Sequence, residues 1–396
     1  MVQLWALGRE GEVVQSRVAE FERTHAGVRV RVQQIPWSAA HEKLLTAYVG
    51  GAMPDVFQVG NTWIPEFAAL HALDPLDERL RRSRVMPADD YFPGLFDANA
   101  VNGHTLGVPW YVDTRLLFYR TDLVGAAGFT AAPRRWSDWV AAMTEIRERS
   151  AGSEFAVLLP INEWQPLVIL ALQRGAALLR DGDTRGNFRS AAFREAFGFY
   201  VDLFRRRLAP LASEAEVANL YQDFARGVFA FYITGPWNLG EFRARLPAGV
   251  PWSTAPLPAP DESYPGVSIA GGASLAIFRG SPRKEAAWAL IEFLSQPDEQ
   301  RELYRLTGDL PVRKSAWSGS GPGADPGAEA FRLQLEHVRP TPRIPEWERI
   351  ADRITRCAET VVRAELGIDE ALAALDRDVD EILEKRRWLM RREAAS

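Results

Sequence analysis

An aromatic pair and a carboxylate stand within four residues of one another in the segment Gly107-Val-Pro-Trp-Tyr-Val-Asp113. Trp110 and Tyr111 offer flat apolar faces, and Asp113 offers charged acceptors for hydroxyl donors. That combination suits a neutral, hydroxyl-rich ligand such as a sugar ring. The alternative is a buried strand with one satisfied polar residue at its end, and the segment alone does not decide between the two.

Residues of the same types follow other predicted strands. A tryptophan beside glycine or proline has little core to fill, which favours stacking on a ligand. In an α/β sheet, ligands bind at the carboxyl ends of the strands, so the residues just after each strand are the candidates. After the first strand, Glu12 is as well placed as Glu10, and the alternative for either acid is that it only favours a helix N-terminus. The candidates are Glu10, Trp37, Asn61 and Trp63 in the first third of the chain, and Asn162, Glu163, Trp164 and Trp237 further on.

The first third of the chain predicts the elements that position these residues. Apolar runs indicate strands at 2–7, 28–32 and 55–59, and each is followed by apolar residues at helical spacing. The order β-α-β-α-β-α predicts a mostly parallel, right-handed α/β sheet with helices on its faces. Such a sheet brings the three loops, with Trp37 expected in the second of them, to one edge.

The later part of the chain predicts further strands at 155–159, 228–233 and 273–278. The glycine pair Gly271-Gly272 allows a backbone to approach a ligand or another strand closely, and a plain turn is the alternative. Segment 251–265 is rich in Pro, Ser and Asp, which indicates a crossing between two lobes. Segment 318–327 holds four glycines and two prolines and is predicted to be a mobile surface loop.

Length and composition narrow the class of protein. A chain of 396 residues exceeds one usual core, so we expect two domains. A net charge of −5 without a basic stripe argues against nucleic-acid binding. The single cysteine, Cys357, forms neither an internal disulfide nor a metal cluster. No apolar run approaches the ~20 residues of a membrane helix, and the start lacks a signal region, so either the protein is cytosolic or an export signal has been removed.

Signatures of catalysis are largely absent from the sequence. No lysine follows a glycine, so there is no phosphate-binding loop, and no G-x-S-x-G elbow occurs. The five histidines show no H-x-x-x-H pairing, which makes a metal hydrolase improbable, and we expect no cofactor. The remaining enzymatic alternative is a carbohydrate-active hydrolase that uses Asp113 and Glu163 as its pair of acids.

Six motifs occur in order along essentially the whole chain. They are Phe21-Glu-Arg-Thr-His-Ala-Gly-Val-Arg-Val30, Ala52-Met-Pro-Asp-Val-Phe-Gln-Val59, Gly107-Val-Pro-Trp-Tyr-Val-Asp113 with Leu117-Phe-Tyr-Arg-Thr-Asp-Leu123, Gly235-Pro-Trp237, Gly271-Gly272 and Leu310-Pro-Val-Arg313. Each motif is weak alone, and the six in this order are specific. With them the chain resembles the solute-binding proteins of bacterial ABC importers, in particular the family that binds sugars and oligosaccharides.

This resemblance implies a two-lobed periplasmic-binding-protein fold, in which each lobe is a mostly parallel sheet flanked by helices. The N-terminal lobe would comprise residues 1–112 plus 268–313, and the C-terminal lobe residues 113–267 plus 314–396. Three hinge crossings would fall near Asp113, near 260–268 and near 313–320. The ligand cleft would lie between the lobes.

The resemblance also implies roles for particular residues. Tyr111 and Asp113 match residues that meet the sugar at a hinge, and Trp237 matches an aromatic platform. The pair Gly271-Gly272 matches a close backbone approach, and Arg313 matches a partner across the cleft. The complete implied set of ligand contacts is Glu10, Trp37, Asn61, Trp63, Tyr111, Asp113, Asn162, Glu163, Trp164, Trp237, Gly271, Gly272 and Arg313.

Among subfamilies, the chain is most similar to those that take maltose, trehalose or related α-glucosides. The resemblance implies a non-enzymatic monomer that delivers its sugar to the permease subunits of an ABC transporter, with no nucleic-acid partner. A sensor kinase or receptor is the alternative partner. The implied location is periplasmic or extracellular. The alternatives there are a free protein and one anchored to the membrane through an N-terminal segment that is removed from this sequence.

Overall fold

The computed structural model of the chain describes residues 1–92, 94–149, 155–213, 216–217 and 219–395. These residues form two compact units. Unit 1 comprises Met1–Asp113, Pro236–Gly240 and Gly271–Glu329, and unit 2 comprises Thr114–Gly235, Glu241–Ala270 and Ala330–Ser396. Residues 314–329 group with unit 1, and the lobe bounds given above stay a prediction.

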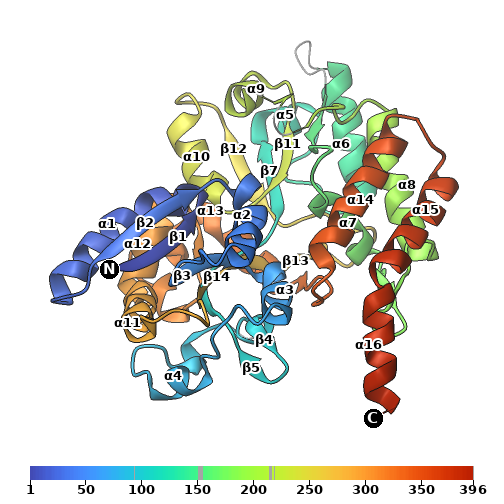
Figure 1. Ribbon diagram of the computed structural model, residues 1–396. Helices are drawn as coiled ribbons and strands as arrows, with labels where there is room; N and C mark the ends of the chain where they lie inside the picture. Colours follow the sequence, from blue (N-terminus) through green and yellow to red (C-terminus); the bar gives the residue numbers. More distant parts are fainter. Residues whose placement is uncertain (93, 150–154, 214–215, 218, 396) are drawn as a thin grey trace. The chain divides into compact units, whose positions relative to one another are not determined.

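Unit 1 is built on a six-stranded mixed sheet (Figure 1). Parallel pairing is confined to three adjacent strands, and the other three pair antiparallel. The expectation of a mostly parallel sheet is therefore wrong for this unit, because two strands return from distant parts of the chain and run against their neighbours. The spatial order is β15 (Leu310–Pro311), β6 (Val108–Asp113), β14 (Gly271–Ile277), β3 (Val56–Gly60), β1 (Val2–Leu7) and β2 (Val30–Ile35).

The longer helices of unit 1 form because their apolar residues recur every three or four positions. Val14, Val18 and Phe21 of the first helix are buried on one face, and each such side chain contributes ~1.5–3 kcal/mol on burial. The predicted second strand lies two residues later than expected, and Trp37 opens a helix rather than standing in a loop. The helices are α1 (Gly8–Thr24), α2 (Trp37–Val49), α3 (Ile64–Ala69), α4 (Asp77–Arg82), α11 (Lys284–Leu294) and α12 (Pro297–Thr307).

Unit 2 contains a four-stranded sheet in the order β12 (Trp252–Ala255), β7 (Leu116–Arg120), β11 (Phe231–Thr234) and β8 (Val157–Leu158). Among the described strands of this four-stranded sheet, only β8 and β11 pair in parallel, so the mostly parallel sheet is wrong here too. The segment 251–265 was expected to cross between lobes. That expectation is wrong for its first part, since β12 pairs along β7 inside unit 2.

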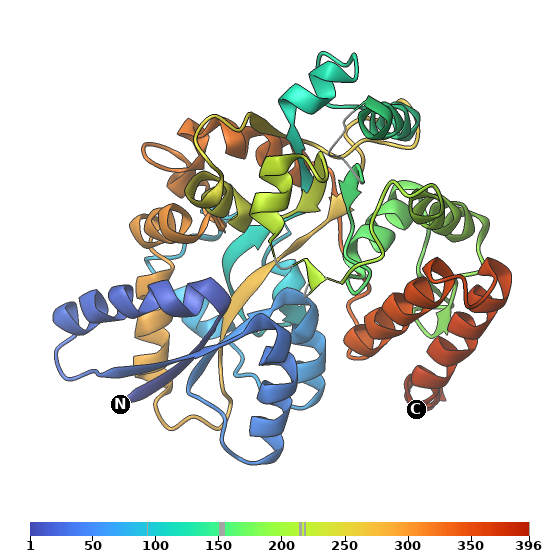
Figure 2. The ribbon, with the colours of Figure 1, turned by 90° about the horizontal axis from the view of Figure 1, so that it is seen from above.

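Helices cover this second sheet and bury a large aromatic core that includes Trp139, Phe193, Phe197 and Trp347. Helices α14 and α15 pack side by side in Figure 1 and in Figure 2. The helices with residues in unit 2 are α5 (Thr121–Ala126), α6 (Trp136–Arg149), α7 (Gln165–Gln173), α8 (Ala191–Arg205), α9 (Leu220–Arg226), α10 (Trp237–Arg245), α13 (Pro326–Leu335), α14 (Trp347–Val362), α15 (Ile368–Ile382) and α16 (Glu384–Ala395).

Short elements complete the two units. The predicted loop 318–327 contains a 3-10 turn at Pro322–Ala324 and the start of α13, because Pro326 is suited to the first position of a helix. In the ranges that the structure describes, no helix has both the length and the apolar composition needed to cross a bilayer. The remaining paired strands are β4 (Ala100–Val101) with β5 (His104–Thr105), β9 (Leu179–Arg180) with β10 (Arg185–Gly186), and β13 (Ser268–Ile269) with β16 (Val338–Arg339).

Candidate functional site

Glu10 lies in the first turn of α1, directly after β1, and only 5% of its surface is exposed. Its Oε1 atom accepts hydrogen bonds from the hydroxyl of Tyr111 at 2.5 Å and from Nε2 of Gln58 at 3.2 Å. The Trp37 side chain donates a further hydrogen bond to this carboxylate. The amide of Gln58 is itself fixed, because its Oε1 accepts from the backbone N–H of Leu7 at 2.7 Å. The structure thus selects Glu10, rather than Glu12, as the acid held at the sheet edge.

Glu12 has a different environment. Its carboxylate is about half exposed and forms an ion pair with Arg9 on the surface of α1. That pair lowers the pKa of Glu12, mainly through the hydrogen bond from Arg9. The two acids that the sequence left as equal candidates are therefore distinguished by burial and partners.

The indoles of Trp37 and Trp63 contact each other beside Glu10, and we call this pair the aromatic step. Gly8 has a φ of +47°, and a Cβ atom there would lie 2.5 Å from Cδ1 of Trp37, so the ring fits only against glycine. Trp37 keeps 38% of its surface exposed and meets Trp63 edge to face, with ring centroids 5.7 Å apart. Trp63 is buried and lies over Gly60, and half-buried Asn61 opens the turn that carries it. The exposed face of Trp37 is therefore available for stacking.

Asp113 ends β6 and is paired with Gly271 at the start of β14. A Cβ atom on Gly271 would lie 1.9 Å from Oδ1 of Asp113, so the carboxylate occupies the space above this glycine. Gly272 has a φ of +132°, and a Cβ atom there would lie 2.4 Å from the carbonyl oxygen of Tyr111. The glycine pair therefore serves a close approach of β14 to β6, and the alternative of a plain turn is wrong.

Asp309 lies beside Asp113 on the other edge of β6 from Gly271. In the antiparallel register Leu310 pairs with Val112, which places Asp309 at the level of Asp113. Only 3% of Asp309 is exposed. Burial raises the pKa of Asp309 well above its ordinary value, and the charges of Glu10 and Asp113 raise it further. Burial likewise raises the pKa of Glu10, although the hydrogen bond from Tyr111 acts in the opposite direction.

The Tyr111 hydroxyl thus lies among carboxyl groups from α1, from β6 and from the residue directly before β15. Burial raises its pKa well above the ordinary value, and the charges of Glu10, Asp309 and Asp113 contribute in the same direction. Tyr111 is therefore a neutral hydrogen-bond donor. The carboxyls do not form a metal centre, since no group of three metal-ligating side chains is found among the described residues.

Gln58 and Asp309 belong to the site although sequence reasoning did not select them. Gln58 had a signal, because it is a polar residue inside the apolar run of a buried strand. Asp309 had none, since its place depends on the pairing of β15 with β6, about 200 residues earlier in the chain.

The substitution Asp309→Asn tests, through the pH dependence of stability, the cluster of carboxyl groups formed by Glu10, Asp113 and Asp309. A carboxyl whose folded pKa is raised holds its proton longer in the native state, so its contribution to stability is present at low pH and is lost as pH rises from about 3.8 through the folded pKa. We expect the variant to melt about 2–4 °C above the parent at pH 7, the effect of ~1 kcal/mol in a domain of this size. Below pH 4 the difference should vanish. Differential scanning calorimetry from pH 3 to pH 8 measures it, and a difference independent of pH would contradict the assignment.

Trp237 opens α10 and is half-buried. Gly308 has a φ of +87°, and a Cβ atom there would lie 2.6 Å from the carbonyl oxygen of Pro236 and 3.3 Å from Cα of Trp237. This contact brings the start of α10 against the segment that carries Asp309. Trp237 thus belongs to unit 1 although the rest of α10 from Glu241 belongs to unit 2.

Arg313 is buried and contacts residues of unit 1. Its Nε donates to Oδ2 of Asp90 at 2.7 Å, and its Nη1 donates to the carbonyl oxygens of Val85 and Ser295 at 2.7 and 3.0 Å. The guanidinium also lies 5.6 Å from the ring centre of Tyr91. The structure therefore gives Arg313 a set of internal partners, and its role as a partner across a cleft stays a prediction.

The candidates of unit 2 share one turn between β8 and α7. Asn162 is exposed, while Glu163 and Trp164 are half-buried. Trp164 meets the buried ring of Trp347 edge to face, with centroids 5.3 Å apart. Burial, with a smaller contribution from the charge of Glu163, raises the pKa of Tyr200. The turn thus presents an amide, a carboxylate and an indole together, as the sequence predicted.

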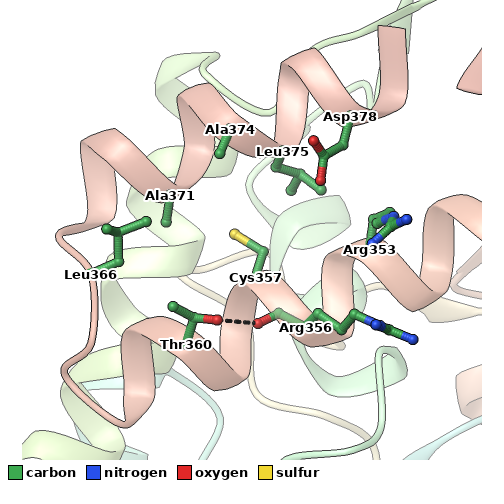
Figure 3. A pocket seen from close by; sticks show the side chains of 9 residues that line it. All are labelled: Arg353, Arg356, Cys357, Thr360, Leu366, Ala371, Ala374, Leu375 and Asp378. Atoms are coloured by element: carbon green, nitrogen blue, oxygen red, sulfur yellow. Dashed lines mark hydrogen bonds between the residues drawn. The ribbon is translucent and has the colours of Figure 1, made fainter. Parts of the chain in front are cut away.

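A separate cavity of about 160 Å³ lies between α14 and α15 (Figure 3). Burial raises the pKa of the Cys357 thiol to about 12, so this cysteine is unreactive at neutral pH. No predicted site residue lines the cavity. Its lining consists of Arg353, Arg356, Cys357, Thr360, Leu366, Ala371, Ala374, Leu375 and Asp378.

Comparison with known proteins gives consistent matches. The family model described as "Bacterial extracellular solute-binding protein" matches residues 5–301. The structure of the sugar-binding protein MalE from Xanthomonas citri is 47% identical, covers 98% of this chain and 99% of its own, and superposes with a TM-score of 0.89. A solute-binding protein from Thermotoga lettingae, bound with α-D-tagatose, is 26% identical over 96% of this chain and 99% of its own, with a TM-score of 0.86. The diacetylchitobiose binding protein DasA of Streptomyces coelicolor is 25% identical over 84% of this chain and 76% of its own length.

Proposed function

The chain belongs to the bacterial extracellular solute-binding proteins, and we propose that its ligand is an α-glucoside disaccharide or short oligosaccharide such as maltose or trehalose. The general role of the chain, as the sugar- or oligosaccharide-binding component of an ABC transporter, follows from the family and its relatives. The likeness to the sugar-binding protein MalE of Xanthomonas citri supports a sugar as the ligand, and the choice of an α-glucoside rests on the resemblance of the sequence motifs.

The observation that carries the proposal is the buried Glu10 carboxylate beside the exposed face of Trp37. Oε1 of Glu10 is occupied by Tyr111 and Gln58. The Trp37 side chain and the backbone N–H of Glu10 also donate to this carboxylate, so a ligand hydroxyl would share the carboxylate with these donors or replace one of them. A charged acceptor fixed by neutral donors beside an indole is suited to a sugar, whose C–H face stacks while its hydroxyls donate.

The proposed contacts divide between the two units. Unit 1 supplies the hydrogen-bonded cluster, the aromatic step and the glycine pair, and we add Asp309 to them. Unit 2 supplies the turn after β8. The full proposed set is Glu10, Trp37, Asn61, Trp63, Tyr111, Asp113, Trp237, Gly271, Gly272, Asp309 and Arg313 from unit 1, with Asn162, Glu163 and Trp164 from unit 2.

Isothermal titration of the chain against a panel of mono-, di- and trisaccharides tests the assignment. We expect heat with maltose or trehalose and none with peptides or polyamines. Binding of a peptide or polyamine alone would exclude a sugar-binding role, and binding of a β-linked sugar in place of an α-glucoside would exclude the finer assignment. Recovery of the intact sugar after long incubation separates this function from hydrolysis by Asp113 and Glu163.

The remaining parts of the proposal concern partners and place. We propose a monomer that acts outside the cytoplasm and delivers sugar to the permease subunits. The complete ABC transporter, reconstituted in vesicles, should hydrolyse ATP faster when the sugar-loaded chain is added. Stimulation by the sugar without the chain would contradict that role.

Trp37→Ala tests the aromatic step. Because the exposed indole face is proposed to stack on the sugar, we expect about 10-fold weaker binding, which corresponds to ~1.4 kcal/mol. Trp388→Ala is the matched control, since Trp388 is also exposed but lies on α16. Titration calorimetry at one temperature compares the two, and equal affinities would remove Trp37 from the site.

A further inference from the structure

The C-terminal helix α16 carries a concentration of exposed apolar side chains. Trp388, Leu389 and Met390 are 52%, 43% and 40% exposed. Three of the seven exposed large apolar residues found in the described part of the chain are therefore consecutive on this helix. Exposed apolar groups gathered in one place indicate an interaction surface, whereas single ones do not.

Basic residues surround these apolar side chains. Five basic and two acidic residues give the segment 384–395 a net charge of +3, in a chain whose net charge is −5. Lys385, Trp388, Leu389 and Arg392 follow the spacing i, i+3, i+4, i+7, so they share one face of the helix. The Arg392 guanidinium lies 4.7 Å from the ring centre of Trp388. This face therefore combines two apolar groups with a cation at each end.

The start of α16 is fixed to unit 2 by two arginines of its first turns. Arg386 donates to the carbonyl oxygen of Asp183, and Arg387 donates to those of Thr184 and Asp380. Beyond them, the helix extends away from α15 toward the C-terminus (Figure 1). The structure thus holds the base of α16 and presents its exposed face to the surroundings.

We propose that α16 docks the protein on an anionic lipid surface. A bilayer with negatively charged headgroups is complementary to this face. Its headgroup layer attracts the basic side chains, and its apolar layer can bury Trp388 and Leu389. Tryptophan prefers this interfacial depth, and long basic side chains reach from it back to the headgroups. Because the rest of the chain is acidic, a negative surface attracts this end and repels the remainder, which orients the protein.

Co-sedimentation of the full chain with vesicles tests the proposal independently of sugar binding. We expect binding to vesicles that contain phosphatidylglycerol and none to vesicles of phosphatidylcholine alone. Added salt should weaken it, since surface charge attraction is screened. Trp388→Ser with Leu389→Ser, and separately Arg391→Glu with Arg392→Glu, should each lower the vesicle affinity about 10-fold or more.

Arg81→Glu with Arg84→Glu is the matched charge control, because both arginines are exposed but lie in unit 1. It should leave vesicle binding within about 2-fold of the parent. Circular dichroism and sugar titration should show that every variant remains folded. Absence of binding to anionic vesicles at low salt, or equal binding by the α16 variants, overturns the proposal. Sedimentation equilibrium adds one further outcome: self-association that Trp388→Ser removes, without vesicle binding, would assign this face to a second copy of the chain.

Discussion

Arg313→Met is expected to lower the free energy of unfolding by about 3–5 kcal/mol, the usual cost of removing one partner of a buried ion pair. The substitution keeps most of the side-chain volume but leaves Asp90, which is 17% exposed, without its guanidinium. It also leaves the carbonyl oxygens of Val85 and Ser295 without the donor Nη1. Urea unfolding of the full chain, followed by circular dichroism, measures the loss.

Arg305→Met is the control for this change. Arg305 is also an arginine of unit 1 paired with a carboxylate, but its side chain is 65% exposed, so its loss should leave the free energy of unfolding close to that of the parent. Sugar titration well below the unfolding transition separates the two roles of Arg313. A stable variant that binds sugar at least 10-fold more weakly would favour the predicted contact with the ligand over the internal role.

Glu10→Gln is expected to weaken sugar binding by about 100-fold, or ~3 kcal/mol, because a charge-assisted hydrogen bond to the ligand is replaced by a neutral one. The amide has nearly the shape of the carboxylate and can still accept from Tyr111. The fold should therefore persist, and removal of a buried charge whose pKa burial raises should not lower stability at pH 7.

Glu12→Gln is the matched control, two residues along the same helix. Its carboxylate is exposed and paired with Arg9, so its sugar affinity should stay within about 2-fold of the parent. Titration calorimetry with the sugar that binds the parent chain compares the three proteins. If both variants bind as the parent does, Glu10 stabilises the sheet edge and does not contact the ligand.

Local pattern was enough to predict the elements near the start of the chain. The first strand has the predicted bounds, and the apolar spacing that follows it forms α1. These predictions succeed because a buried strand or an amphipathic helix is encoded in a few adjacent side chains. The pairing direction of the sheets was not predictable in this way, because β14 and β15 reach unit 1 only after the chain has built most of unit 2.

The sequence by itself determined the family, through six motifs in order, and it predicted the chemical character of the candidate site, through aromatic and acidic residues placed after strands. Only the tertiary structure decided which of these residues are buried and which lie close to one another. It buried Glu10 and left Glu12 on the surface, brought Asp309 to the level of Asp113, and gave Arg313 internal partners. The physical reason is that residue type and spacing are local properties, whereas burial and hydrogen-bond partners depend on which distant strands come to lie side by side.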